Sequence, residues 1–234
     1  MKNVSDIPSC EECIIKFPTI FKHLTADELA EINYEKKCSF QKRGNVIFHE
    51  NNRINGFYCL NKGIVKQYKT GIDGKEQIIR FAKRGDIIGY RSILSNELSC
   101  TSAKVIEDAM LCFISASTLI ALVKNNSNFA LELMQLVCKE LGEANNYITD
   151  IAQKSVRERL AEVLLLLKNN FELDKDHVLQ ISLTREELAN IVGTATESVI
   201  RLLSEFKSDK MIDLDGRKIK ILDIHALTKV ANIY

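Results

Sequence analysis

Residues 183–203 read LTREELANIVGTATESVIRLL, and this stretch decides the fold of the C-terminal part of the chain. Thr184 and Glu187 have the spacing of a capping box, which predicts that a helix begins there. Apolar residues follow at helical spacing up to Gly193, a residue type that commonly ends helices. A second helix, from about Thr194, carries its own apolar face. Two short helices around a glycine turn predict a helix-turn-helix.

The residues after this motif predict a β-hairpin. Met211–Leu214 and Ile219–Leu222 are short apolar runs separated by Asp215-Gly216, a strong signal for a tight turn. A helix-turn-helix followed by a hairpin is a winged helix-turn-helix. Together with an expected helix from Ser155 to about Asn169, it predicts a C-terminal domain over residues 154–234.

Such a unit can read DNA through the second helix, whose N-terminal end enters the major groove. There an Arg can bond a guanine edge and a Glu can accept from a cytosine amine. Glu197 and Arg201 are four apart and share one helix face, although they could equally form a surface ion pair worth only ~0.3–0.5 kcal/mol. Arg185 and the wing can reach phosphates, and short hydroxyls lie near the helix start. The residues that we expect at the DNA are Arg185, Thr194, Thr196, Glu197, Ser198, Arg201, Arg217 and Lys218.

A long helix is predicted over residues 127–153, which contain no proline and a single glycine, Gly142. Its apolar residues alternate spacings of three and four, as in a coiled-coil seam. Periodicity alone leaves two interpretations open: packing against the preceding domain, or a homodimer interface. The candidate interface residues are Leu133, Leu136, Val137, Leu141, Ala144, Ile148 and Ile151.

Residues 1–126 predict an N-terminal domain that starts with helices and continues as a β-roll. Thr25 and Glu28 form a further capping box. From about Cys38 to Phe113, short segments rich in β-branched and aromatic residues recur between glycine-containing turns. Strands at such intervals indicate a roll or barrel. The expected fold class is therefore α+β, with a β-roll, a long dimerisation helix and a winged helix-turn-helix.

Composition excludes several classes of protein. The 234 residues carry 32 Lys+Arg and 31 Asp+Glu, a net charge of +1, which excludes a grossly basic nucleic-acid coat. The sequence has no apolar run of 18 residues and no apolar signal-peptide core, so we expect a cytoplasmic protein that does not bind membranes. It lacks a Walker-type loop and a GxSxG elbow, and its four histidines are isolated. We therefore expect no enzyme, with a metal-dependent cupin as the remaining enzymatic alternative.

Residues 183–203 resemble the helix-turn-helix signature of the CRP/FNR family of bacterial transcription regulators, and the resemblance extends over nearly the whole chain. Residues 85–89 (GDIIG) resemble the turn before the family's effector loop, and residues 155–162 the first helix of its DNA-binding domain. The resemblance implies a homodimer on a two-fold-related site in double-stranded DNA, with RNA polymerase as a further partner. It implies that Glu197 and Arg201 read bases, that Arg185 and Ser198 lie near the backbone, and that Thr196 replaces a second base-reading Arg of some members.

The effector is not identified by the sequence. Relatives that bind cyclic nucleotides carry a Glu just after Gly89 and an Arg-Ser pair about ten residues later. Here these positions hold Tyr90 and Cys100-Thr101. A buried phosphate needs a cation or a ring of backbone donors, so the sequence argues against cAMP and leaves another small ligand open. The candidate effector-pocket residues are Gly89, Tyr90, Arg91, Ser92, Cys100 and Thr101.

Seven cysteines are the other candidate for signal detection. Their odd number and an expected reducing compartment argue against a disulfide framework. Cys10, Cys13 and Cys112 fall where the oxygen-sensing branch of the family has iron–sulfur ligands, but the further N-terminal Cys of that branch is absent. Three thiolates are one fewer than a cluster normally needs. An iron–sulfur cluster, a thiol redox pair and inert buried thiols all remain open.

Overall fold

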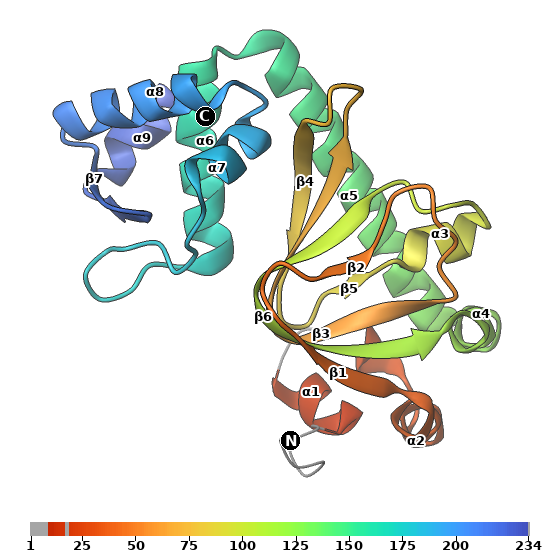
Figure 1. The fold of residues 1–234 in the computed structure, drawn as a ribbon. Helices are drawn as coiled ribbons and strands as arrows, with labels where there is room; N and C mark the ends of the chain where they lie inside the picture. The colour runs from red at the N-terminus through yellow and green to blue at the C-terminus, as the bar shows by residue number, and fades with distance from the viewer. Residues whose placement is uncertain (1–8, 17–18, 234) are drawn as a thin grey trace. The chain divides into compact units, whose positions relative to one another are not determined.

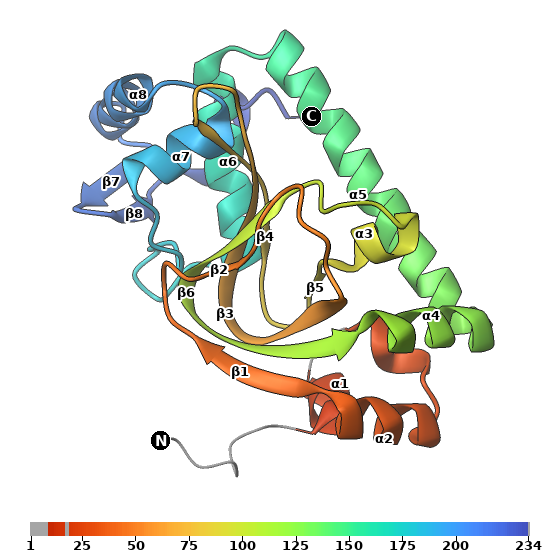
Figure 2. The same ribbon diagram turned by 45° about the vertical axis from the view of Figure 1, so that its right-hand side comes forward.

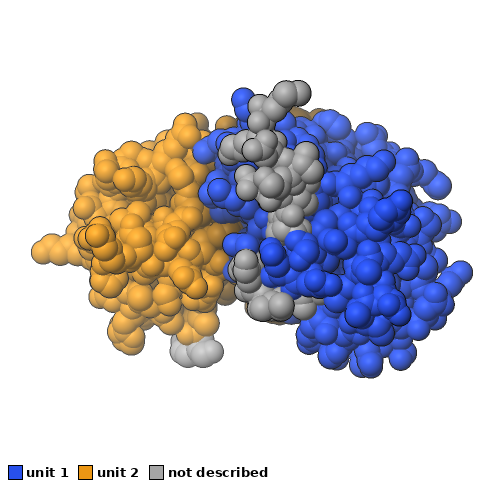
Figure 3. Space-filling model, turned by 90° about the horizontal axis from the view of Figure 1, so that it is seen from below, with its two compact units in different colours: residues 1–70, 78–140 blue, residues 71–77, 141–234 orange. Residues whose placement is uncertain are grey.

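The computed structural model describes residues 9–16 and 19–233, and it divides the chain into two compact units. Unit 1 comprises residues 1–70 and 78–140, and unit 2 comprises residues 71–77 and 141–234. Figure 3 colours the two units separately. The long predicted helix is α5 (Ser127–Gln153), with the expected bounds, and the division between the units falls within it.

Unit 1 begins with short helices, as predicted. They are α1 (Cys10–Lys16), the 3₁₀ helix η2 (Ile20–His23) and α2 (Ala26–Glu35). Thr25 and Glu28 form the expected capping box at the start of α2, since each side chain accepts from the other residue's backbone N–H. The Asn33 side chain on α2 accepts a hydrogen bond from the backbone N–H of Cys10, 3.2 Å away, which ties α1 to α2.

The β-roll of unit 1 is built around two long antiparallel strands, β3 (Gly56–Thr70) and β6 (Ser102–Ser115) (Figure 1). The main strand order is β1-β6-β3-β4, while β2 pairs with β6 and β5 with β3. The remaining strands are β1 (Lys37–Gln41), β2 (Val46–Phe48), β4 (Glu76–Ala82) and β5 (Ile87–Ile88). Figure 2 shows α1, α2 and α4 (Ala116–Asn125) together at one end of this sheet.

The sequence predicts a turn at residues 61–63, but β3 continues through them. The pairing of β3 with β6 shifts register near Lys62, so the turn signal is absorbed as a β-bulge. Gly63 has φ +86°, and a Cβ there would lie 2.4 Å from the carbonyl oxygen of Asp108. A glycine fits this close approach between strands and its left-handed backbone, whereas other residues would not. The sequence likewise predicts two short strands, at residues 103–105 and 110–114, but residues 102–115 form one continuous strand, β6.

The core of unit 1 lies between the roll and the first half of α5. Phe57, Leu119, Phe129 and Leu133 are at most 2% exposed and belong to one apolar cluster. The short helix α3 (Tyr90–Ser95) adds Tyr90 to the same cluster. The roll therefore rests against α5 through Phe129 and Leu133.

Unit 2 contains the winged helix-turn-helix in the predicted order. Its elements are α6 (Val156–Phe171), α7 (Arg185–Val192), α8 (Thr196–Ser208), β7 (Ile212–Asp215), β8 (Lys218–Ile221) and α9 (Ile224–Val230). Thr184 and Glu187 form the predicted capping box of α7, and Gly193 ends that helix with φ +72°. Asp215 pairs with Lys218 across the predicted hairpin turn.

No helix among the described residues is long and apolar enough to cross a membrane.

Candidate functional sites

Helix α8 is apolar on the side that packs into unit 2. Val199, Leu202, Leu203 and Phe206 are buried, and they recur at helical spacing. The opposite side, formed by Glu197, Ile200, Arg201 and Ser204, is exposed, and we call it the outer face of α8. The buried stripe fixes the helix by packing and leaves the outer face free to contact a partner.

Arg157 ties α6 to α8. Its guanidinium bonds Glu205 and Asp209, each at 2.8 Å, and lies 4.8 Å from the ring centre of Phe206. Arg159 donates to the backbone carbonyl of Val192 at 3.1 Å, so α6 also holds the end of α7. These contacts explain the positions of the two arginines in residues 155–162.

Arg201 does not form the surface pair with Glu197 that sequence spacing allowed. Its Nη1 bonds Glu205 at 2.5 Å, one turn further along, and its side chain is 68% exposed. Glu197 is also exposed, and no side-chain hydrogen bond of Glu197 is found in the described part of the chain. An exposed ion pair is worth little, so Arg201 can exchange Glu205 for another acceptor at small cost.

Arg185 is held against the wing rather than projecting freely. Its Nη2 donates to the carbonyl oxygen of Gly216 at 2.8 Å, and burial lowers the pKa of the guanidinium. Nη1 is buried without a partner among the described residues. The bond between α7 and the wing was not foreseen from the sequence, because Arg185 and Gly216 are 31 residues apart.

The other predicted DNA contacts lie around the same helix. Arg217 and Lys218 are exposed on the wing, and Thr194, Thr196 and Ser198 are half-buried at the start of α8. Ala195 is the N-cap of α8 and makes no side-chain bond there. The hydroxyls of this end are thus close to the N–H groups that a helix start leaves unpaired.

The candidate effector residues all line one small cavity in unit 1, together with Arg80 and Glu140. Its volume is about 20 Å³, well below the ~300–1,000 Å³ of small-molecule sites. Arg80 and Glu140 form an ion pair there, so the charge of this arginine is already neutralised, while Arg91 also lines the cavity. The Tyr90 hydroxyl has no partner among the described residues, and burial raises its pKa to about 12. Arg80 and Glu140 reach the cavity from β4 and α5, and no local sequence pattern marks them as part of it.

A second cavity in unit 1, of about 50 Å³, collects cysteines from distant parts of the chain. We call it the thiol cavity, defined by Cys10, Cys13, Cys59 and Cys112 with Lys36 and Asn61. Cys10 and Cys13 lie on α1, Cys59 on β3 and Cys112 on β6. Three of these cysteines are candidates from the sequence, whereas Cys59 is not, because its neighbours in the sequence form no recognisable motif.

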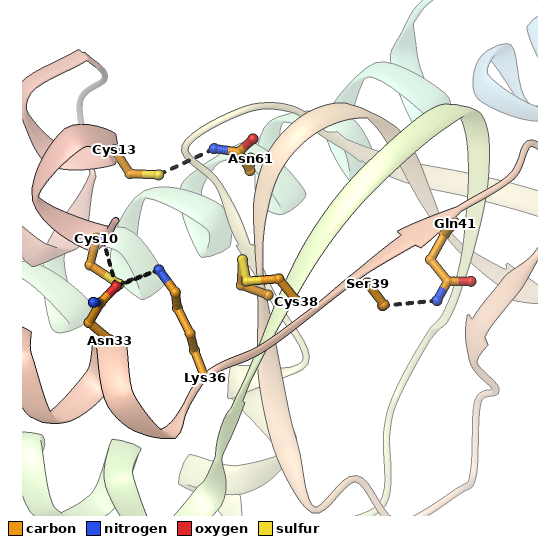
Figure 4. The surroundings of a disulfide bond; sticks show 9 residues. Cys10, Cys13, Asn33, Lys36, Cys38, Ser39, Gln41 and Asn61 are labelled. Carbon is orange, nitrogen blue, oxygen red and sulfur yellow. Dashed lines mark hydrogen bonds between the residues drawn. A yellow bond between two sulfur atoms is a disulfide. The ribbon is translucent and has the colours of Figure 1, made fainter. Parts of the chain in front are cut away.

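Two N–H donors point at sulfur atoms in this cavity (Figure 4). The Lys36 ammonium lies 3.5 Å from Cys10 Sγ, and the Asn61 amide lies 3.2 Å from Cys13 Sγ. Burial raises the pKa of the Cys10 thiol, and Lys36 partly opposes this shift. Burial raises the pKa of Cys59 well above its usual value, and the neighbouring Cys10 and Cys13 add to the increase.

Cys112 is joined to Cys38 by a disulfide, which corrects the expectation that a thiolate is present at that position. Strand pairing explains the bond, because Cys38 of β1 lies directly opposite Cys112 of β6. In this oxidised form, no group of three or more His, Cys, Asp and Glu side chains in residues 9–16 and 19–233 is arranged to hold a metal ion. The chemistry of the donor set, buried sulfurs with N–H donors, nevertheless suits a soft metal.

The candidate dimer residues on α5 separate into two groups. Leu133 is 2% exposed in the core of unit 1, and Leu136 and Val137 pack against that core, which corrects their assignment to an outward seam. Leu141, Ala144, Ile148 and Ile151 are exposed, as are Leu131 and Met134. The inward-facing residues of the first half of α5 therefore pack against unit 1, whereas Leu141, Ala144, Ile148 and Ile151 are exposed, and a homodimer interface at these four residues stays a prediction.

These features define a winged helix-turn-helix DNA-binding regulator with an N-terminal β-roll domain. Comparison with known proteins gives the family. The family model described as "Cyclic nucleotide-binding domain" matches residues 40–126, and that described as "Crp-like helix-turn-helix domain" matches residues 158–230. The chain belongs to the CRP/FNR family of transcription regulators.

Similar proteins agree with this assignment. The chain is 28% identical over 226 residues to the fumarate and nitrate reduction regulatory protein of Escherichia coli K12, covering 95% of this chain and 90% of the relative. Electron transport regulator A of Shewanella oneidensis matches with the same identity and coverage. A transcriptional regulator of the crp/fnr family from Eubacterium rectale has the same fold, with a TM-score of 0.75, 21% identity and coverage of 92% and 98% of the two chains. Bradyrhizobium japonicum FixK2 aligns with a TM-score of 0.74 and 23% identity over 83% of this chain and 96% of FixK2.

Proposed function

We propose that the protein acts in the cytoplasm as a homodimer that binds a two-fold-related site in double-stranded DNA and there meets RNA polymerase. The observation that carries the DNA-reading part is the outer face of α8. Glu197 and Arg201 are exposed on a helix whose other side is anchored by buried apolar residues. Arg201 would bond a guanine edge and Glu197 would accept from a cytosine amine.

The remaining polar residues would position the protein on the DNA. Arg217 and Lys218 on the wing are exposed cations that can neutralise phosphates, and Ser198 and the threonines at the start of α8 can donate to phosphate oxygens. Arg185 would act mainly by fixing the position of the wing, through its hydrogen bond to the carbonyl oxygen of Gly216. Residues 155–234 contain 12 Lys+Arg and 13 Asp+Glu, so nonspecific affinity would be modest.

We propose that the dimer forms through the exposed stripe of α5. Outward residues recur with spacings of three and four: Leu131, Met134, Cys138, Leu141, Asn145, Ile148 and Ala152. This is the pattern of a two-stranded coiled coil, and Asn145 would be its polar position. Leu141 and Ile148 are 61% and 65% exposed in the single chain. Contact of this apolar surface with water is unfavourable, and a partner helix packed against it would remove that contact.

The test of DNA reading is Arg201→Ala on a site first selected from random double-stranded DNA. We expect a loss of about 1–3 kcal/mol of specific binding and relaxed discrimination at one base pair. Lys207→Ala is the matched control, because Lys207 lies on the last turn of α8 and is 51% exposed. Binding must be measured at one salt concentration. Full specific affinity of Arg201→Ala would refute the proposed docking.

A second candidate function concerns the signal, and the thiol cavity favours it. Cys10, Cys13 and Cys112, the three candidates from the sequence, line one cavity although they lie up to 102 positions apart. We propose that these cysteines detect redox conditions. They would act either as thiols that are oxidised or as ligands of an iron–sulfur cluster. A bound cluster would supply electron transfer, or it would be lost on oxidation. The experiment is an absorbance spectrum with iron and sulfide analysis after anaerobic purification. A colourless chain without iron would exclude the cluster.

A further inference from the structure

The turn between β3 and β4, Gly71–Gln77, belongs to unit 2 together with the winged helix-turn-helix, and we call it the tip. Two backbone hydrogen bonds close this turn. The Gly71 N–H donates to the carbonyl oxygen of Lys75 at 2.9 Å, and the Gly74 N–H donates to that of Gly71 at 3.0 Å. The tip is therefore a defined turn that presents its side chains from fixed backbone positions.

Gln77 donates hydrogen bonds from the tip to the end of α7. Its Nε2 lies 2.5 Å from the carbonyl oxygen of Asn190 and 3.3 Å from that of Ile191. The same nitrogen donates to the Tyr147 hydroxyl at 2.6 Å, and this hydroxyl donates to the Ile191 carbonyl at 3.0 Å. Gln77 and Tyr147 therefore act together on two neighbouring backbone carbonyls.

These two carbonyls are among the last four of α7, which have no partner within the helix. At one end of this group, the carbonyl of Ala189 accepts from the two backbone N–H groups that follow the helix. At the other end, the carbonyl of Val192 accepts from Arg159. Gln77 and Tyr147 supply the donors for the two carbonyls in between. The C-terminal end of α7 is thus fully capped, and half of its cap depends on the tip.

The tip also contacts the turn that leads into α8. The Lys75 ammonium donates to the carbonyl oxygen of Thr194 at 2.9 Å, directly before Ala195, the N-cap of α8. A Cβ at Gly193 would lie 3.4 Å from Oε1 of Gln77, so this side chain covers the glycine that ends α7. The backbone that sets the direction of α8 is therefore held by two side chains of the tip.

We infer that Gln77 and Tyr147 are positioning residues for DNA reading: they hold the end of α7 and the following turn so that α8 enters the major groove in one orientation, and Lys75 supports the same turn. The inference rests on the proposed reading of DNA by the outer face of α8. It adds to that function three residues that lie before the DNA-binding domain predicted over residues 154–234.

The two parts of DNA binding should respond differently to loss of these contacts. A side chain that reads a base must be placed to within about 0.5 Å, so a looser turn weakens base contacts. Nonspecific binding depends on the number of phosphates that are neutralised and tolerates small movements of α8. Loss of the tip contacts should therefore lower specific affinity more than nonspecific affinity.

The test compares variants of the full chain on the selected DNA site and on an unrelated duplex of the same length, at one salt concentration. The variants are Gln77→Ala, Tyr147→Phe and the double variant. Ile72→Ala is the matched control, because Ile72 is a fully exposed residue of the same tip. Hydrogen exchange followed by mass spectrometry reports on residues 188–196, with α9 as the internal reference. Urea unfolding measures the stability of each variant.

We expect Gln77→Ala and Tyr147→Phe each to lower specific affinity by about 3–10-fold, the usual effect of one lost hydrogen bond. Nonspecific affinity should change by less than about twofold, because no phosphate contact is removed. Exchange of residues 188–196 should become faster by about 3–10-fold, while that of α9 stays unchanged. The double variant should lose less than the product of the single losses, because both residues bind the Ile191 carbonyl.

A second pair of variants tests Lys75. Lys75→Arg should keep the specific affinity, because its guanidinium can still donate to the carbonyl of Thr194. Lys75→Met should lower the ratio of specific to nonspecific affinity and speed exchange of residues 188–196. Equal ratios for these two variants would remove Lys75 from the inference.

Three results would overturn the positioning role. Equal losses of specific and nonspecific affinity, in step with a lower urea midpoint, would show that Gln77 contributes only to stability. Tighter specific binding by Gln77→Ala would show that the tip holds α8 away from DNA. Unchanged affinity and unchanged exchange in both single variants would show that the contacts do not hold the turn.

Failure of the proposed function gives a different result. Full specific affinity of Arg201→Ala would refute the docking of α8 and with it the role of the tip in DNA reading. The exchange measurement needs no DNA, so faster exchange of residues 188–196 in Gln77→Ala would still show that the tip holds the turn. Together the two measurements separate an error about the docking of α8 from an error about Gln77.

Discussion

The outer face of α8 and the thiol cavity differ in how far apart their residues lie along the chain and in how much water reaches them. Glu197 and Arg201 are one helical turn apart and exposed. The cavity cysteines come from α1, β3 and β6 and are enclosed. An exposed site keeps its side chains charged and mobile at little cost, whereas a buried site shifts the pKa of its thiols and needs neighbouring donors.

The largest effect should come from the core beneath the outer face. Phe206 is fully buried, so Phe206→Ala should destabilise unit 2 by about 3–5 kcal/mol through lost burial and a cavity. Ile200→Ala, on the exposed side of the same helix, is the control. Urea unfolding followed by circular dichroism tests this. A fall in the unfolding midpoint of Ile200→Ala as large as that of Phe206→Ala would exclude loss of burial as the cause.

Burial predicts a difference in thiol reactivity. Because the pKa of Cys59 is raised, its thiolate fraction at pH 8 is small, and alkylation should be at least about tenfold slower than at exposed Cys100. The rate at Cys59 should rise as pH increases toward its raised pKa. Mass spectrometry of the metal-free chain after timed iodoacetamide treatment measures both sites. Equal rates at pH 8 would show that water reaches the cavity freely.

The capping box of α7 should contribute a smaller amount. Thr184 Oγ1 accepts from the Glu187 backbone N–H at 3.0 Å, so Thr184→Ala should cost about 1 kcal/mol of unit 2 stability. Ser182→Ala, an exposed substitution two residues earlier, is the control. Urea midpoints of the two variants compare them directly. A loss in Ser182→Ala as large as in Thr184→Ala would exclude capping as the cause.

The smallest effect should appear at the wing. Arg217→Ala should weaken binding of all DNA sequences similarly and reduce the salt-dependence slope by about 1, because one phosphate contact is lost. Lys229→Ala on α9 serves as the exposed control. Titrations at several salt concentrations give both slopes. Sequence-selective weakening would instead place Arg217 at a base edge.

The same contrast explains how much could be predicted from the sequence. Thr184, Glu187, Gly193 and the Asp215-Gly216 turn act over a few residues, so unit 2 could be read from local patterns. Cys59 could not be recognised because its partners are brought by strand pairing across 53 positions, from Cys59 to Cys112. Local spacing also cannot determine which half of an apolar stripe packs inward. The sequence therefore could not show that Leu133, Leu136 and Val137 of α5 pack against unit 1 while the later apolar residues are exposed.

The bond between Cys38 and Cys112 also changes the unfolded chain. It closes a loop with a sequence separation of 74 residues, and the chain-entropy estimate for such a loop is about 4 kcal/mol. The reduced form lacks this restraint, so it would unfold more often unless a bound metal compensates. Since a change of ~1–2 kcal/mol in stability can alter the amount of a protein severalfold through proteolysis, reduction of this bond would lower the number of copies that persist.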